Sequence, residues 1–194
     1  MRIGIDIDGV LTNFERWQID YVSKFAYENN IGEIKNINAY SSDGIFGWND
    51  EIDDKFWEEY LIYYATNEKA RAFSGEVIKK LKNDGNEIFI ITARYLTDRE
   101  SEEGKNMRNI VSNWLKENNI YYDELIFSGE DKRNICREKK IDIMIEDCAK
   151  NIDELSKVVP KIICFDAQYN KECKGENVVR CYSWYDIYNK INKM

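Results

Sequence analysis

The sequence predicts an α/β protein in which helices cover both faces of a parallel β-sheet. From residue 85 onward, short apolar segments alternate with segments of helical periodicity, and a further apolar segment occupies residues 3–11. This alternation is typical of a Rossmann-like, three-layer parallel sheet. Residues 12–74 do not alternate. We therefore expect an α/β core formed by residues 1–11 and 75–194, with a small helical cap inserted after the first strand.

The expected strands are short and rich in Ile, Val and Phe, as buried strands of parallel sheets are. The first lies within the sequence IGIDIDGVL, residues 3–11. The later strands are expected at residues 86–92, 124–128, 141–145, 161–165 and 177–182.

Helices are expected between these strands because apolar residues recur there at spacings of three and four. The clearest set is Met107, Ile110, Val111, Trp114 and Leu115. Other helices should follow Asp131, end before Pro160, and close the chain around Trp184 and Ile191.

The inserted segment is expected to contain helices and loops only. Residues 13–29 have helical periodicity, residues 36–50 are rich in turn-forming residues, and residues 51–65 form a strongly aromatic helix. Because the insertion directly follows the first strand, it is placed to reach over the carboxyl end of that strand.

Composition excludes several classes of function. The formal net charge of −8 over 194 residues argues against a polynucleotide or an anionic membrane surface as the main partner, but a small phosphorylated metabolite is compatible with it. The chain has no histidine, so imidazole zinc sites, Ser-His triads and Cys-His dyads are excluded. The sequence leaves the oligomeric state open, a homo-oligomer included.

The cysteines and the N-terminus indicate a cytoplasmic protein. The five cysteines are odd in number and show no C-x-x-C spacing, so free thiols in a reducing compartment are expected. Asp6 and Asp8 interrupt the only apolar segment near the N-terminus, and no segment approaches transmembrane length.

Two aspartates inside a buried strand require compensation, because an uncompensated buried carboxylate costs several kcal/mol. Asp6, Thr92 and Asp147 each lie at the end of an expected strand, and Lys132 follows another strand end. The carboxyl ends of parallel strands share one edge of a sheet, where ligands bind. A divalent cation shared by the aspartates, together with the lysine, would supply the missing positive charge.

These residues stand in motifs that resemble those of the haloacid dehalogenase superfamily of phosphohydrolases. The motifs are DIDGVLT, IITAR, DK and IMIED, in the order found in that superfamily. Within it, DIDGVLTNFERW, the small helical cap and IEDC resemble the 5′(3′)-deoxyribonucleotidase family. Two positions depart from the pattern. The first acid of the fourth motif is Glu146, and the candidate Lys132 has Arg133, Lys139 and Lys140 as competitors.

The resemblance implies a role for each acid. Asp6 would be the nucleophile that forms an aspartyl-phosphate, and Asp8 would be the general acid and base. The side chains of Asp6 and Asp147 and the main-chain carbonyl of Asp8 would hold Mg²⁺, with Glu146 and Asn151 supporting them. The alternatives are a strand-end turn for Asp6 and helix capping for Asp8 and Asp147.

The resemblance also implies the phosphate and substrate contacts. Thr92, the amide of Ala93 and Lys132 would bind the phosphoryl oxygens, although a threonine at a strand end or a solvated lysine is common. Arg94 could reach a phosphate or form a surface salt bridge. Phe14 is the best candidate for contact with a nucleobase, whereas most other aromatic residues of the insertion are expected to form its own core.

The sequence therefore favours a Mg²⁺-dependent phosphomonoesterase of (deoxy)nucleoside 5′-monophosphates. A phosphatase of sugar phosphates or other small phosphoesters is the enzymatic alternative. A receiver-like module that binds phosphate and Mg²⁺ without turnover is the non-enzymatic one, but such a switch has no need of a general acid at Asp8.

Overall fold

The computed structural model describes all residues, 1–194, and has the predicted α/β fold. Six parallel strands form one sheet in the order β3-β2-β1-β4-β5-β6. The strands are β1 (Arg2–Ile5), β2 (Glu87–Thr92), β3 (Glu124–Phe127), β4 (Ile143–Glu146), β5 (Lys161–Phe165) and β6 (Val178–Cys181). Their carboxyl ends lie on one edge, and β1 is central, between β2 and β4.

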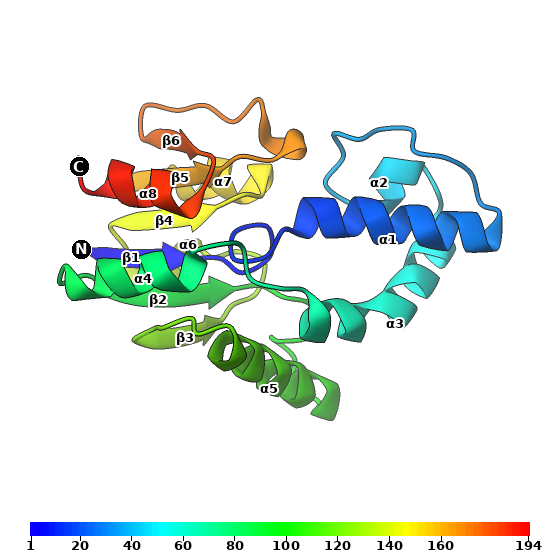
Figure 1. Ribbon diagram of the computed structural model, residues 1–194, viewed down its shortest axis with the longest axis horizontal. Coiled ribbons are helices and arrows are strands. Elements are labelled where there is room, and N and C mark those ends of the chain that lie inside the picture. Colours follow the sequence, from blue (N-terminus) through cyan, green and yellow to red (C-terminus); the bar gives the residue numbers. More distant parts are fainter.

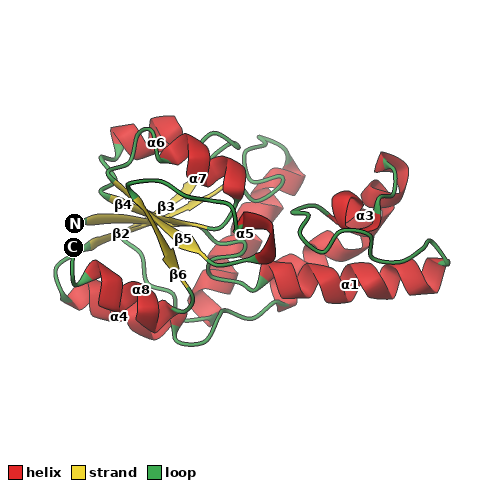
Figure 2. Cartoon of the chain, turned by 90° about the horizontal axis from the view of Figure 1, so that it is seen from above, coloured by secondary structure: helices red, strands yellow, loops and turns green.

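Helices cover both faces of the sheet, as Figure 2 shows. Helices α4 (Ser74–Asn83), α5 (Glu102–Glu117) and α8 (Trp184–Ile191) share a core of 22 buried residues with one face. Helices α6 (Arg133–Glu138) and α7 (Ala149–Leu155) cover the other face, where a second core lies. Successive residues of a strand point to opposite faces of the sheet. In β2, Ile88 and Ile90 therefore pack in the first core, whereas Phe89 and Ile91 pack in the second.

The segment after β1 forms a separate group of helices beyond the carboxyl ends of the strands (Figure 1). We call it the α1–α3 unit: α1 (Phe14–Asn29), α2 (Ser42–Phe46) and α3 (Asp50–Asn67). It has its own core of ten buried residues, seven of them aromatic, and this core stabilises a mostly helical insertion of this size. Both chain termini lie at the opposite end of the molecule.

One local prediction for this unit was incomplete. Residues 36–50 were expected to be irregular, but they contain the short helix α2. Ile45 and Phe46 are buried against α1 and α3, and this packing stabilises a five-residue helix that the local sequence would not.

The chain crosses between the sheet and the α1–α3 unit twice, and Arg71 joins the two crossings. Its backbone N–H donates to the carbonyl of Leu11 at 2.6 Å. Its side chain donates to the carbonyls of Thr12 at 2.9 Å and Gly9 at 3.0 Å, and its guanidinium lies 4.4 Å from the ring centre of Phe165. Arg71 therefore fixes the loop that follows β1.

All five cysteines are free, as expected, and Cys136, Cys164 and Cys181 are buried. None of the helices has both the length and the apolar character needed to cross a membrane.

Candidate active site

The loop after β1 begins at Asp6, whose backbone N–H donates to the carbonyl of Ile145 at 3.1 Å. This bond aligns the end of β1 with β4, so that Asp6 and Asp147 come close together. Gly9 follows with φ +84°, and a Cβ atom there would lie 1.9 Å from Oδ2 of Asp147. Only glycine satisfies both the backbone conformation and the close approach.

Three buried acids meet where β1 and β4 end. Carboxylate oxygens of Asp6, Glu146 and Asp147 all lie within 4.8 Å of one another. Lys132 is buried beside them, and its Nζ donates to Oδ1 of Asp6 at 2.7 Å and to Oε2 of Glu146 at 2.9 Å. The structure therefore brings the acids that follow β1 and β4 into contact with the expected lysine.

Two of the three competitors of Lys132 have other partners. Arg133 pairs with Asp131, and Lys139 pairs with Glu124. Of these cations, only Lys132 contacts the acidic cluster.

The cluster contains three carboxyl groups but only one ammonium group. Burial raises the pKa of Asp6 from 3.8 to about 7 and, together with Glu146 and Asp6, raises the pKa of Asp147 well above its ordinary value. One carboxylate oxygen of Glu146 accepts a hydrogen bond from Lys132, and the other accepts from the backbone N–H groups of Asp147 and Cys148. Oδ1 of Asp147 is buried without any hydrogen-bond partner. An unpartnered carboxylate oxygen beside a second carboxylate is the donor set that a hard divalent cation binds.

Two residues that the sequence did not single out hold Asp147 in place. The Tyr169 hydroxyl donates to its Oδ2, and Nδ2 of Asn170 donates to its main-chain carbonyl at 2.7 Å. Asn151, which was expected in this supporting role, makes no side-chain hydrogen bond. Asn170 lies in the one-turn helix η1 (Gln168–Asn170) after β5. The sequence did not indicate its contact with Asp147 because the two residues are far apart along the chain.

Asp8 lies at the side of the cluster that faces the α1–α3 unit. It accepts hydrogen bonds from Nε of Arg94 at 3.1 Å and from the Tyr64 hydroxyl at 2.6 Å. Burial alone would raise the pKa of Asp8, but the Arg94 guanidinium and these hydrogen bonds hold it below its ordinary value.

Arg94 forms a salt bridge, one of the two alternatives considered for it, but the bridge is to Asp8 and is not on the surface. Its side chain is only 3% exposed, and its guanidinium lies 5.2 Å from the ring centre of Tyr64. The Tyr64 hydroxyl also lies 2.7 Å from Oγ1 of Thr12. A residue of α3 thus contacts both the loop after β1 and the Asp8–Arg94 pair, a link between distant segments that the sequence gives no sign of.

The remaining predicted residues lie around the same edge. Thr92 ends β2, is fully buried, and its Oγ1 accepts from the backbone N–H of Arg94 at 3.2 Å. Ala93 and Phe14 both line a cavity of about 700 Å³ that begins at Asp8 and Arg94 and extends along α3. Its other lining residues are Tyr40, Asp53, Asp54, Trp57, Glu58, Leu61, Tyr64 and Tyr95.

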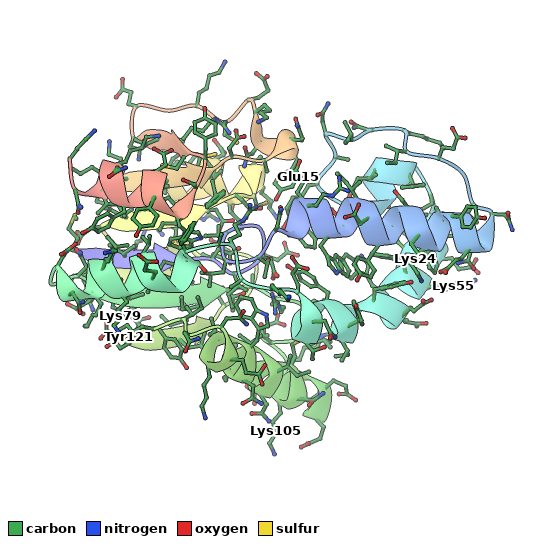
Figure 3. The ribbon with its side chains drawn as sticks, viewed as in Figure 1. Glu15, Lys24, Lys55, Lys79, Lys105 and Tyr121 are labelled. Atoms are coloured by element: carbon green, nitrogen blue, oxygen red, sulfur yellow. The ribbon has the colours of Figure 1, made fainter.

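A further contact joins α1 to the sheet domain. Glu15 lies at the start of α1 and is labelled in Figure 3. Its side chain accepts a hydrogen bond from the backbone N–H of Gln168 at 2.9 Å. This bond places the start of α1 next to the loop that carries Tyr169 and Asn170.

Several solved structures share this architecture. A haloacid dehalogenase-like hydrolase of Streptococcus pneumoniae superposes with a TM-score of 0.64 at 10% identity, covering 98% of this chain and 97% of that one. A D,D-heptose 1,7-bisphosphate phosphatase of Burkholderia thailandensis gives 0.59 at 11% identity, covering 100% and 99%. At such identities the likeness establishes the fold, which is that of the haloacid dehalogenase hydrolases.

Fold and acidic cluster together define a phosphatase of the haloacid dehalogenase type. The whole chain, residues 1–194, matches the family described as 5′ nucleotidase, deoxy (Pyrimidine), cytosolic type C protein, and the chain belongs to that family. A nucleotidase of Clostridium acetobutylicum is 29% identical over 195 residues, which cover all of this chain and 95% of the relative.

Replacing Asp6 by Asn should stabilise the metal-free protein at neutral pH. Folded Asp6 keeps its proton to about pH 7, whereas in the unfolded chain it ionises near 3.8. The folded state therefore binds more protons between these values, so its stability falls as the pH rises through this window. With a chelator present, Asp6→Asn should melt above the wild type at pH 7.5, by about 2–4 °C for each kcal/mol gained. The difference should shrink at pH 5, and a wild type that melts higher at pH 7.5 would contradict the charge analysis.

Gly9→Ala should disable the site without unfolding the sheet. The new Cβ would collide with the Asp147 carboxylate, and the positive φ adds backbone strain of about 1 kcal/mol or more. We expect phosphatase activity to fall at least tenfold while the circular dichroism spectrum is retained. Gly85→Ala is the matched control, because Gly85 also has a positive φ of 86° but has open space at its Cβ position. Equal losses in both variants would mean that strain, not contact with Asp147, is responsible.

Proposed function

We propose that this phosphatase is a Mg²⁺-dependent phosphomonoesterase acting on (deoxy)nucleoside 5′-monophosphates. The observation that carries the proposal is the juxtaposition of the buried Asp6–Asp147 pair with an aromatic-lined cavity that starts at Asp8. The family match and the nucleotidase relative support the same substrate class.

The residues present fit a magnesium ion. The side chains of Asp6 and Asp147 and the main-chain carbonyl of Asp8 would hold it, while Glu146 stays paired with Lys132. Few protein ligands, all of them oxygen, suit Mg²⁺, which keeps water and phosphate oxygens in its remaining positions. When bound, the ion supplies positive charge that screens the attacking carboxylate from the anionic phosphate.

Asp6 would attack the phosphorus atom and displace the substrate's ester oxygen, forming an aspartyl-phosphate. Asp8 would protonate that oxygen and then take a proton from the water that hydrolyses the intermediate. The Arg94 guanidinium lowers the pKa of Asp8, which favours the ionised form that activates water. For the first step Asp8 must take up a proton from solvent, to which its side chain is partly exposed, and this requires its pairing with Arg94 and Tyr64 to loosen.

Phosphate binding would fall to Thr92, the backbone N–H of Ala93 and Lys132. Lys132 is already fixed between two carboxylates and therefore needs no reorganisation to neutralise charge on the phosphoryl group. The Thr92 hydroxyl accepts one backbone hydrogen bond, which leaves its own hydrogen available to a phosphate oxygen.

Residues 12–74 would act as the substrate-selecting cap on the core formed by residues 1–11 and 75–194. Phe14 lines the cavity that begins at Asp8 and lies 6.2 Å, centre to centre, from the ring of Trp57 with an interplanar angle of 19°. A nucleobase could contact such rings, and each stacked base contributes about 1–3 kcal/mol.

The direct test is phosphate release from a panel of nucleoside 5′-monophosphates, sugar phosphates and p-nitrophenyl phosphate, with Mg²⁺ present. Nucleotides should give the highest kcat/KM, and Asp6→Asn should abolish turnover of every substrate. A sugar phosphate at the top of the panel would refute the substrate assignment. Residual turnover in Asp6→Asn would refute the covalent mechanism.

Chelation should abolish activity, and Mg²⁺ should restore it. Asp147→Asn should raise the Mg²⁺ concentration for half-maximal activity at least tenfold, and Mg²⁺ should no longer raise its melting temperature. Asp98→Asn is the control, because Asp98 is exposed and forms no hydrogen bond. Activity that persists in excess chelator would show that the acidic cluster is not a metal site.

Phe14→Ala should lose binding energy of about 1–3 kcal/mol towards nucleotides, the value of one stacked base. The loss should appear in kcat/KM for nucleotides and leave p-nitrophenyl phosphate hydrolysis nearly unchanged. Phe46→Ala controls for packing, because Phe46 belongs to the same aromatic core but does not line the cavity. A Phe14→Ala variant that loses activity equally on both substrates would show that Phe14 only packs the cap.

A further inference from the structure

Helix α3 presents one continuous face to the cavity. Its lining residues recur at spacings of three and four, as residues on one helix face do: Asp54, Trp57, Glu58, Leu61 and Tyr64. Tyr64 marks the catalytic end, because its hydroxyl donates to Asp8. Asp54 is ten residues earlier, which corresponds to about 15 Å along the helix axis. The cavity therefore runs outward from Asp8 along α3.

The two ends of this cavity differ in charge. At the catalytic end, the nearly buried Arg94 is paired with Asp8, and its Nη1 has no hydrogen-bond partner. Further out, Asp54 and Glu58 border the cavity and take part in no ion pair or hydrogen bond. Asp53, in contrast, accepts hydrogen bonds from Ser42 and Trp48, which both belong to the α1–α3 unit.

Carboxylates offer only hydrogen-bond acceptors at neutral pH, so they bind N–H and O–H donors and repel other anions. Glu58 is six residues before Tyr64, about 9 Å along the helix axis. A substrate whose phosphate lies at Asp6 would extend its other end along this wall. Its distal group therefore meets two exposed, unpaired carboxylates that border an aromatic cavity.

We propose that Asp54 and Glu58 determine specificity: they reject substrates that carry a second anion remote from the phosphate and favour neutral ends that offer hydrogen-bond donors. This inference rests on the proposed nucleotide substrate and names the kind of base the site accepts. The two carboxylates would act by repelling substrates with a second negative charge. Such repulsion can distinguish substrates even though the groups at the reaction centre contact only the phosphate.

The test compares two nucleotides that differ in charge at one ring position. They are 5-hydroxymethyl-2′-deoxycytidine 5′-monophosphate, which is neutral at the base, and its 5-carboxy counterpart, which is anionic there. The ratio of their kcat/KM values is measured for the wild type, for the double variant Asp54→Asn/Glu58→Gln, and for Glu59→Gln. Glu59 is the matched control, since it lies on the same helix but borders a different surface depression.

The wild type should prefer the neutral nucleotide at least about tenfold, and the preference should fall below about threefold in the double variant and persist in Glu59→Gln. Raising the salt concentration should weaken the wild-type preference, because exposed charges are screened. If neither nucleotide turns over, their inhibition constants against p-nitrophenyl phosphate give the same ratio.

Two results overturn the inference while leaving the proposed function intact. One is equal use of both nucleotides by the wild type, and the other is an unchanged preference in the double variant. If p-nitrophenyl phosphate is hydrolysed but neither nucleotide is bound or cleaved, the nucleotide assignment itself fails and this inference fails with it.

Discussion

Three carboxylates and one ammonium group are buried together at the ends of β1 and β4. The rest of the structure depends on this constraint. Asp6, Glu146 and Asp147 are nearly inaccessible to water, and Lys132 neutralises only part of their charge. The surrounding structure compensates for the rest. Backbone N–H groups cap Glu146, and Tyr169 fixes one oxygen of Asp147. The remaining oxygen of Asp147 is buried without a hydrogen-bond partner.

The acidic cluster and the cavity wall come from different parts of the molecule. The cluster lies at the edge of a parallel sheet whose strands are buried on both faces, so the positions of its side chains are fixed by a large packed core. The cavity wall comes from α3, which belongs to a unit with its own aromatic core. Tyr64 connects the two parts, because its hydroxyl contacts Asp8 and Thr12 while its ring lies under Arg94. Movement of α3 would therefore change the surroundings of Asp8 directly.

Sequence periodicity was sufficient for the strands and for most of the helices. Each of β2 to β6 forms within two residues of its expected position, since a buried strand is a short apolar segment that local composition indicates. Strand β1 ends at Ile5, so Asp6 and Asp8 lie in the loop after the strand and not inside it. Helix α2 was missed because its stability comes from Ile45 and Phe46 packing against other helices. Arg94 was misjudged for a related reason. Its burial depends on Asp8 and Tyr64, which are 86 and 30 residues away in the sequence.

The sequence by itself determined the fold class, the order of the elements and the four polar positions at strand ends. These follow from local hydrophobic patterns and from the rule that parallel strands share a carboxyl edge. Only the tertiary structure decided that Lys132 is the paired cation, that Asn170 and Tyr169 hold Asp147, and that Arg94 pairs with Asp8. It alone placed one face of α3 along the cavity. Contacts between segments far apart in the chain depend on how layers pack in three dimensions, and no local pattern in the sequence encodes that geometry.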